Sequence, residues 1–144
     1  MMEFLLYLTP IGREIYELAS HKVRFVENAP VCRKLDIFGY YESDKNLMTV
    51  CTTRMKKTDN PKYWINETIY HEAVHMAQDC KAGGREWYEA FGINKYQMPL
   101  SQRRLDDLQT STKMHPENRA IEHEAFWMED KPDKVKYVVQ KYCF

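Results

Sequence analysis

One long helical segment that carries a conspicuous polar motif is the feature that most constrains how this chain can fold. The segment begins at Asn60-Pro61, where a capping residue precedes proline, and no helix breaker interrupts it before Gly83-Gly84. Inside it, residues 71–75 read H-E-x-x-H. Because residues four apart lie on the same face of an α-helix, we expect one continuous helix with both imidazoles on one side.

The motif contains the side chains needed for a metal site. His71 and His75 lie one turn apart, so both can bind the same ion. Glu72 points toward the open side of that ion, where it can act as a general base on a zinc-bound water. A lone histidine on such a helix is more often an ordinary, partly buried polar residue. Two histidines at this spacing around a glutamate favour zinc.

The composition limits the partners of the chain. A length of 144 residues suits one domain with one core, and we expect a single domain over residues 1–144. Lysine plus arginine equals aspartate plus glutamate, at 21 each, which gives no electrostatic basis for binding nucleic acid or an anionic membrane. No apolar run is long enough to span a bilayer. The composition thus argues against nucleic acid and membrane partners, and the partner expected from the H-E-x-x-H motif is a peptide or protein substrate.

Cysteine usage and the N-terminus bear on the cellular compartment. The four cysteines are scattered and form no C-x-x-C pair, so we expect mostly buried, reduced thiols. Cys32 and Cys51 could nevertheless face each other on paired strands. The apolar run Phe4–Leu8 is short, lacks a basic flank and stops at Thr9-Pro10, so no signal peptide is expected. Together these features predict a cytoplasmic protein.

The elements before the long helix predict a small sheet. Thr9-Pro10 caps a helix that continues to about Ser20, and residues 22–27 then alternate between polar and apolar as a half-buried strand does. Residues 35–41 and 47–53 are two β-prone runs separated by a polar loop, which indicates a hairpin.

The chain after the long helix is mainly helical. An irregular, aromatic-rich stretch over residues 85–99 leads to a helix capped by Ser101. A second helix begins near His115 and a third follows Pro132. The whole order predicts an α+β fold, with a small antiparallel sheet packed on the metal-binding helix and further C-terminal helices.

A catalytic zinc takes three protein ligands and keeps one position for water, so a third ligand is needed. The residues after His75 do not continue as H-x-x-G-x-x-H, which excludes a metzincin. The remaining candidates, on or just before the later helix, are Glu122, Glu124, His123 and His115. The two carboxylates stand in a largely apolar segment, where a charge is costly unless it is paired or metal-bound.

The combination of H-E-x-x-H on one helix with E-x-E-A-F on a later helix, over residues 60–129, resembles the gluzincins, specifically small single-domain zincin metallopeptidases. The resemblance implies a zincin-like fold with His71, His75 and Glu122 as zinc ligands. Many gluzincins carry an aspartate four residues after the ligand glutamate, where it orients a zinc histidine. Phe126 stands there in this chain. A ligand at His115 would instead resemble the all-histidine site of SprT-type zincins.

The function expected from these features is zinc-dependent hydrolysis of peptide bonds through a zinc-activated water, with Glu72 as the general base. Four side chains are candidates to stabilise the oxyanion: His123, His115, Tyr96 and Tyr88. The resemblance also implies that the strand over residues 47–53 forms the sheet edge that pairs with an extended peptide. The alternative is a catalytically silent zincin-like module that binds or regulates a partner.

Overall fold

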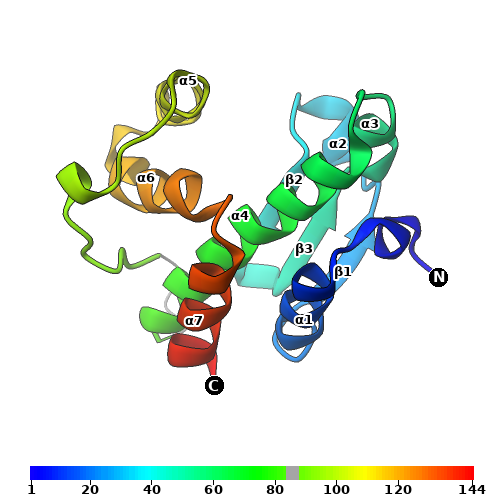
Figure 1. Ribbon diagram of the computed structural model, residues 1–144, viewed down its shortest axis with the longest axis horizontal. Helices are drawn as coiled ribbons and strands as arrows, with labels where there is room; N and C mark the ends of the chain where they lie inside the picture. Colours follow the sequence, from blue (N-terminus) through cyan, green and yellow to red (C-terminus); the bar gives the residue numbers. More distant parts are fainter. Residues whose placement is uncertain (84–87) are drawn as a thin grey trace.

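Helix α4 (Pro61–Lys81) runs through the centre of the molecule, and the β-sheet and the helices from both halves of the chain pack against it (Figure 1). The structure is a computed structural model that describes residues 1–83 and 88–144. The α+β class predicted from the sequence is confirmed.

The ends of α4 are those that the sequence predicts. The Asn60 side chain accepts a hydrogen bond from the backbone N–H of Tyr63, and Pro61 occupies the first helical position. Beyond Lys81 the chain leaves the helix through Gly83, whose φ of +77° favours glycine. Gly84, the second glycine of the predicted stop, lies outside the described residues, as does Trp87.

Helix α4 is buried on almost every side, which is unusual for a helix with so many polar residues. From Ile65 to Asp79 every residue is buried except His71, which is partly exposed. A helix buried all round needs partners for its polar side chains as well as apolar neighbours. The exposure of His71 marks the side on which α4 opens to solvent.

The sheet has three strands, β1 (Arg24–Glu27), β2 (Gly39–Glu42) and β3 (Leu47–Val50), in the order β1-β3-β2. β2 pairs with β3 antiparallel, as the predicted hairpin requires. β1 pairs with β3 parallel, so the sheet is mixed and the purely antiparallel prediction is wrong. A parallel pair needs a connection that crosses over, and the segment containing β2 supplies it.

This strand order also corrects the predicted sheet edge. β3 lies in the middle of the sheet, and the edge strand that faces the cleft beside α4 is β2. The predicted strand over residues 47–53 was too long as well, because its last two residues begin helix α3 (Thr52–Lys56).

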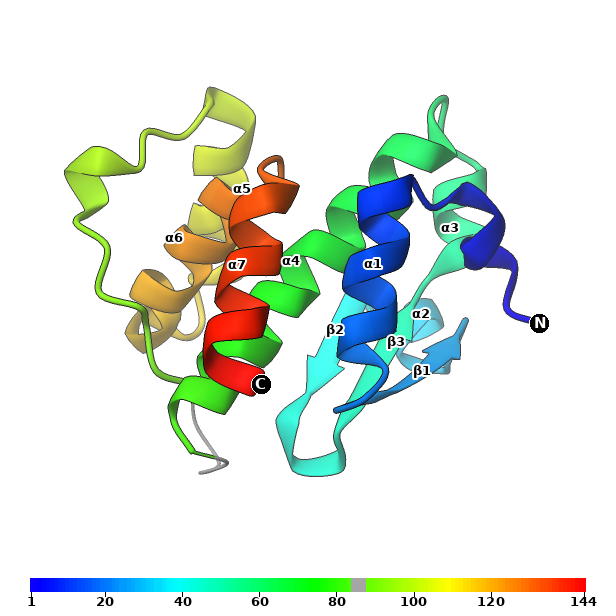
Figure 2. The same cartoon turned by 60° about the horizontal axis from the view of Figure 1, so that its bottom comes forward.

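The remaining elements surround α4 and the sheet (Figures 1 and 2). Nine such elements are described: five α-helices, of which two begin at the predicted Thr9 and Ser101 caps, and four short 3-10 helices. They are η1 (Glu3–Tyr7), α1 (Pro10–Ala19), α2 (Val31–Lys34), η2 (Ser43–Lys45), η3 (Lys95–Gln97), α5 (Gln102–Ser111), η4 (Pro116–Asn118), α6 (Arg119–Met128) and α7 (Pro132–Cys143).

The hydrophobic core joins the layers on both sides of α4. α1 and α7 lie side by side against α4 (Figure 2), and Phe25 and Met48 bring the sheet into the same core. Its largest fully buried apolar side chains are Phe4, Ile15, Met48, Met55, Ile65, Ile69, Met76, Leu108 and Met128.

All four cysteines are paired, which contradicts the expectation of reduced thiols. Cys32 bonds to Cys51, the pair that the sequence left open, and Cys80 bonds to Cys143. The second bridge links the last turn of α4 to the last turn of α7. The sequence separation of 63 residues hid this pair, because only the tertiary packing of the two helices brings the thiols together.

Among the helices of the described residues, none is both long enough and apolar enough to cross a membrane.

Candidate metal centre

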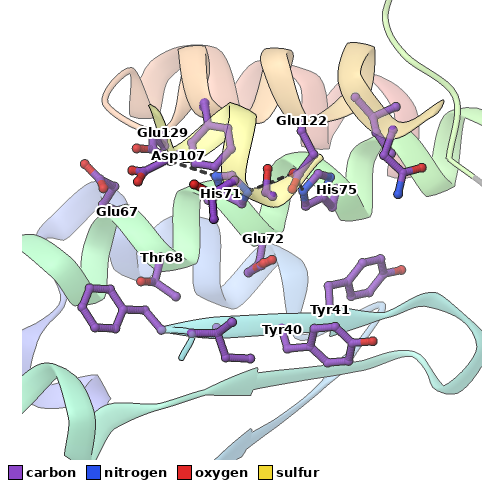
Figure 3. Close-up of a pocket in the computed structure, with 18 of the residues that line it drawn as sticks. Tyr40, Tyr41, Glu67, Thr68, His71, Glu72, His75, Asp107, Glu122 and Glu129 are labelled. Carbon is purple, nitrogen blue, oxygen red and sulfur yellow. Dashed lines mark hydrogen bonds and ion pairs between the residues drawn. The ribbon is translucent and has the colours of Figure 1, made fainter. Parts of the chain in front are cut away.

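The H-E-x-x-H motif faces a cleft of about 910 Å³ (Figure 3). One wall is the segment over residues 35–41, which leads into β2 and includes most of it. The exposed side of α4 forms the floor, and parts of α5 and α6 form the opposite wall. The Trp64, Thr68, His71 and His75 side chains lie along this floor, as expected for one stripe of a helix.

Three ligand-type atoms meet at one point of the cleft. Oε1 of Glu122, on α6, lies 3.3 Å from Nε2 of His71 and 2.5 Å from Nε2 of His75. Figure 3 shows Glu122 reaching across from α6 to both rings. Of the carboxylates considered from the sequence, Glu122 is therefore the one that the fold brings to the two histidines.

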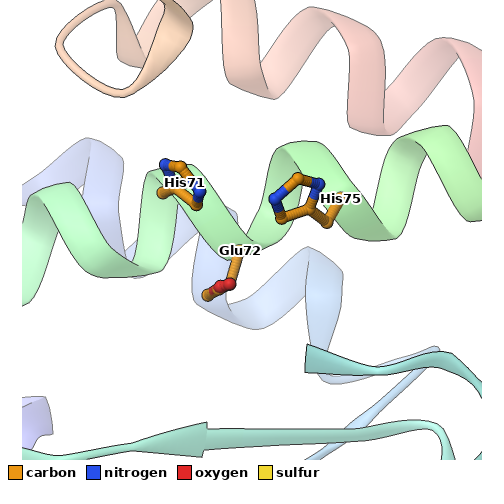
Figure 4. Close-up of side chains that lie close together, drawn as sticks. All are labelled: His71, Glu72 and His75. Atoms are coloured by element: carbon orange, nitrogen blue, oxygen red, sulfur yellow. The ribbon is translucent and has the colours of Figure 1, made fainter. Parts of the chain in front are cut away.

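Glu72 takes a different position from the two histidines. It leaves α4 on the side that faces the sheet, between the two imidazoles and β2 (Figures 3 and 4). Ligand atoms of His71, Glu72 and His75 still lie within 4.8 Å of one another. Glu72 is thus close enough to act on a molecule held between the histidines and the sheet edge.

His71 is oriented by a carboxylate that the sequence analysis missed. Its Nδ1 lies 2.8 Å from Oε1 of Glu129, and the other oxygen of Glu129, Oε2, accepts a hydrogen bond of 2.8 Å from Nε of Arg104. Glu129 directly follows α6, seven residues after Glu122, and seven residues are two helical turns on the same face. Its seven-residue spacing from Glu122 was the signal in the sequence that could have pointed to Glu129.

His75 is held by a neutral partner. Its Nδ1 lies 2.8 Å from Oε1 of Gln78, a fully buried residue one turn further along α4. Both histidines therefore use Nδ1 for a contact inside the protein and direct Nε2 toward Glu122.

The other candidate ligands are occupied elsewhere. Glu124 points away from the cleft and accepts hydrogen bonds from the backbone N–H groups of Phe91, Gly92 and Ile93. His123 contacts the carbonyl oxygen of Met98 at 2.9 Å. His115 lies at the rim of the cleft, where 67% of its side chain is exposed and its nearest ionic partner is Glu117.

The electrostatics of the site follow from burial and from the glutamates. Burial lowers the pKa of His71 and of His75, but the Glu122 carboxylate, joined at His71 by Glu129, outweighs burial and raises both pKa values, that of His71 well above 6.5. The histidines in turn hold the pKa of Glu122 far below its usual value, against the effect of burial. Burial raises the pKa of Glu72.

Only one of the four oxyanion candidates lies beside the histidines. The Tyr88 ring is 5.5 Å from the ring of His75 and lines the cleft. Burial, followed by the charge of Glu72, raises the pKa of Tyr88, so its phenol stays protonated and able to donate. Tyr96 is 84% exposed and does not line the cleft.

The edge of β2 approaches the motif closely. A Cβ atom added to Gly39 would lie 2.5 Å from Cγ2 of Thr68 and 3.3 Å from Cγ of Glu72, so only glycine fits this approach. The carbonyl oxygen of Phe38 accepts a hydrogen bond from the Cys51 N–H and so points toward β3. Successive residues of a strand direct their backbone N–H and C=O groups to opposite sides. The backbone groups of Gly39 and Tyr41 therefore point away from β3, to the free edge of the sheet.

The donor set suits zinc. Two imidazole nitrogens and one carboxylate oxygen form a ligand set found in zinc enzymes, and it leaves a further position open. In each imidazole, the nitrogen that faces away from Glu122 contacts a hydrogen-bond acceptor, Glu129 or Gln78. Metal-binding histidines commonly use their second nitrogen in this way.

The fold and the site define the class as an α+β domain with a candidate metal centre on its central helix. The chain belongs to a family described as a domain of unknown function (DUF8637), whose model matches residues 4–144 and so includes every residue of the site. No curated protein matches the chain, and no solved structure does.

Proposed function

We propose that this protein is a zinc-dependent metallopeptidase, with His71, His75 and Glu122 as the zinc ligands. The observation that carries the proposal is the convergence of the two Nε2 atoms and Oε1 of Glu122 in an open cleft, with Glu72 beside them. A structural zinc site is normally closed by four protein ligands, whereas a site with three ligands in a cleft leaves room for a reactant.

Bound zinc would supply Lewis acidity, which lowers the pKa of water and polarises a carbonyl group. Glu72 would take a proton from water and deliver it to the amine that leaves. Its raised pKa suits a group that must hold this proton in transit. Tyr88, kept protonated beside His75, would donate a hydrogen bond to the carbonyl oxygen as negative charge develops there.

The substrate we propose is an extended peptide that adds to the free edge of β2. The backbone groups of Gly39 and Tyr41 offer hydrogen bonds along this edge, directly beside Glu72. The Tyr88 hydroxyl lies 3.5 Å from the carbonyl oxygen of Tyr41 and so marks one end of the free edge.

The competing proposal is a catalytically silent domain that uses the same cleft to bind a partner. An intact Glu72 beside the histidines argues against it, because a site that only binds has no use for a base in that place. As for location, the two disulfides favour an oxidising compartment over the cytoplasmic location expected from the sequence.

The test compares wild type with Glu72→Gln, a change that keeps the size of the side chain and removes the base. We expect both proteins to carry about one zinc by elemental analysis, and Glu72→Gln to lose roughly 100-fold or more of the hydrolysis of a fluorogenic peptide library. Glu117→Gln, at a side chain that is 68% exposed, is the control and should behave as wild type. Hydrolysis that survives in Glu72→Gln, or a wild type that binds no zinc, would refute the proposal.

A further inference from the structure

We propose that Gln78 is a positioning residue of the metal centre. It fixes the tautomer and the ring orientation of His75, so that Nε2 is the atom presented to the ion. The inference rests on the proposed role of His75 as a zinc ligand. It adds a residue that lies outside the cleft lining and reaches the ion only through another side chain.

The orientation of the Gln78 amide follows from its surroundings. One end of the amide lies 2.9 Å from Oε1 of Glu124 and 3.0 Å from the carbonyl oxygen of Ile121. A carbonyl oxygen only accepts hydrogen bonds, and the Glu124 carboxylate already accepts from three backbone N–H groups. The end that faces them must be the NH2 group, so the amide oxygen is turned toward His75.

This orientation decides the tautomer of His75. The amide oxygen of Gln78 lies 2.8 Å from Nδ1 of His75 and can only accept, so Nδ1 carries the proton. The lone pair of the ring is then on Nε2, where a bound ion would lie between this nitrogen and the Glu122 carboxylate. The opposite tautomer would place two lone pairs against each other inside a fully buried contact, and a flipped ring would lose the hydrogen bond.

The same contacts connect His75 to the loop that follows Tyr88 in the chain. Glu124 holds Gln78 with one oxygen, and its two oxygens together hold the backbone of Phe91 and Gly92. A zinc ligand and the loop beside the proposed oxyanion donor are therefore fixed by one buried pair, Gln78 and Glu124. This explains why an acidic residue stands at position 124 without binding the metal.

The main test is Gln78→Leu, which keeps a side chain of similar size and removes the acceptor. We expect the affinity for zinc, measured by competition with a chromophoric chelator, to fall roughly 10- to 100-fold. In wild type loaded with zinc, ¹⁵N NMR should show His75 with a proton on Nδ1 and the metal on Nε2. In Gln78→Leu the slowly exchanging Nδ1 proton should be lost. A purely structural role would change neither measurement in the folded protein.

Asn66→Leu is the matched control, because Asn66 is another buried amide on α4. It donates to the carbonyl oxygens of Tyr7 and Lys62, remote from the cleft. We expect it to lower the melting temperature while leaving the zinc affinity of the folded protein unchanged. An equal fall of zinc affinity in both variants would assign the effect to general destabilisation and overturn the proposal.

Gln78→Glu supplies a rescue, because it restores an acceptor for His75 while losing the donor to Glu124. It should keep the Nδ1 proton of His75 and bind zinc more tightly than Gln78→Leu. If Gln78→Leu does not fold, Gln78→Asn replaces it, since an amide one methylene shorter withdraws its oxygen from His75. Wild-type zinc affinity and an unchanged His75 spectrum in the variants that lack the contact would overturn the proposal.

The outcome for Gln78 is separable from the outcome for the proposed function. If wild type binds no zinc, the proposed function fails, and the contact is then tested in the metal-free protein by the rate at which the His75 Nδ1 proton exchanges with solvent. A slowly exchanging Nδ1 proton in wild type that is lost in Gln78→Leu would still support the role of Gln78. The same exchange rate in both proteins would refute it.

Discussion

Zinc binding should be strongly coupled to pH, because the ion must displace protons from the histidines. In the metal-free protein the glutamates raise the pKa of both His71 and His75 above 6.5. Glu122 is already ionised, because its pKa is held far below the usual value, so it has no proton to release. Below about pH 6.5, zinc should therefore release close to two protons, one from each ring.

The size of the effect follows from this count. With two protons displaced, the apparent zinc affinity rises roughly 100-fold for each pH unit, or about 2.7 kcal/mol. The slope of the logarithm of zinc affinity against pH is close to two below the folded-state pKa values of the two histidines, and it falls toward one and then zero as the pH passes them. Chelator competition at a series of pH values gives the slope directly, and calorimetry in buffers with different heats of ionisation counts the protons independently.

Glu122→Gln tests the physical cause. His75 owes its raised pKa chiefly to Glu122, whereas His71 keeps the hydrogen bond to Glu129. The variant should bind zinc more weakly and release about one proton fewer below pH 6.5. Glu117→Gln, whose carboxylate is remote from both rings, should retain the wild-type slope. A slope near zero in wild type, or an unchanged slope in Glu122→Gln, would refute this account of the site.

Two further predictions concern the scaffold. Gly39→Ala would place a methyl group 2.5 Å from Cγ2 of Thr68 and push β2 away from α4. We therefore expect the free energy of unfolding, measured with urea, to fall by about 1–3 kcal/mol and peptide hydrolysis to be weaker. Wild-type stability together with wild-type hydrolysis would show that the strand does not lie this close to α4. Replacing Cys80 and Cys143 together by serine opens a loop whose ends are 63 residues apart. The free energy of unfolding should fall by about 4 kcal/mol, because the unfolded chain gains conformational entropy. A melting temperature equal to that of wild type would mean that the bridge does not form.

The parts of this structure that depend on neighbouring residues could be predicted from the sequence. The limits of α4 follow from Asn60-Pro61 and from the glycines after Lys81, and the motif inside it fixes the relation of the two rings and Glu72. Glu122 and Glu124 were both candidates because a carboxylate in an apolar helix requires a partner, and the resemblance to the gluzincins favoured Glu122. In the structure the partner of Glu122 is the pair of histidines.

The parts that depend on tertiary packing could not be predicted in this way. The parallel pairing of β1 with β3 moved the sheet edge to β2, and no local pattern shows strand order. The bridge between Cys80 and Cys143 exists because α7 packs along α4. Glu129 was overlooked because only the position four residues after Glu122, which Phe126 occupies, was considered, although a side chain two turns beyond Glu122 shares its face.

The chemistry and the specificity of this site rest on different kinds of structure. The two histidines and Glu72 stand on one buried helix, and the third ligand on another, so their mutual positions are as rigid as the packing of α4 against α6. One wall of the cleft, over residues 35–41, is instead held by the Cys32–Cys51 bridge and by the hydrogen bond from the Cys51 N–H to the carbonyl oxygen of Phe38. This wall carries none of the proposed metal ligands. Changes in it should therefore alter which peptides are bound while the metal site stays intact.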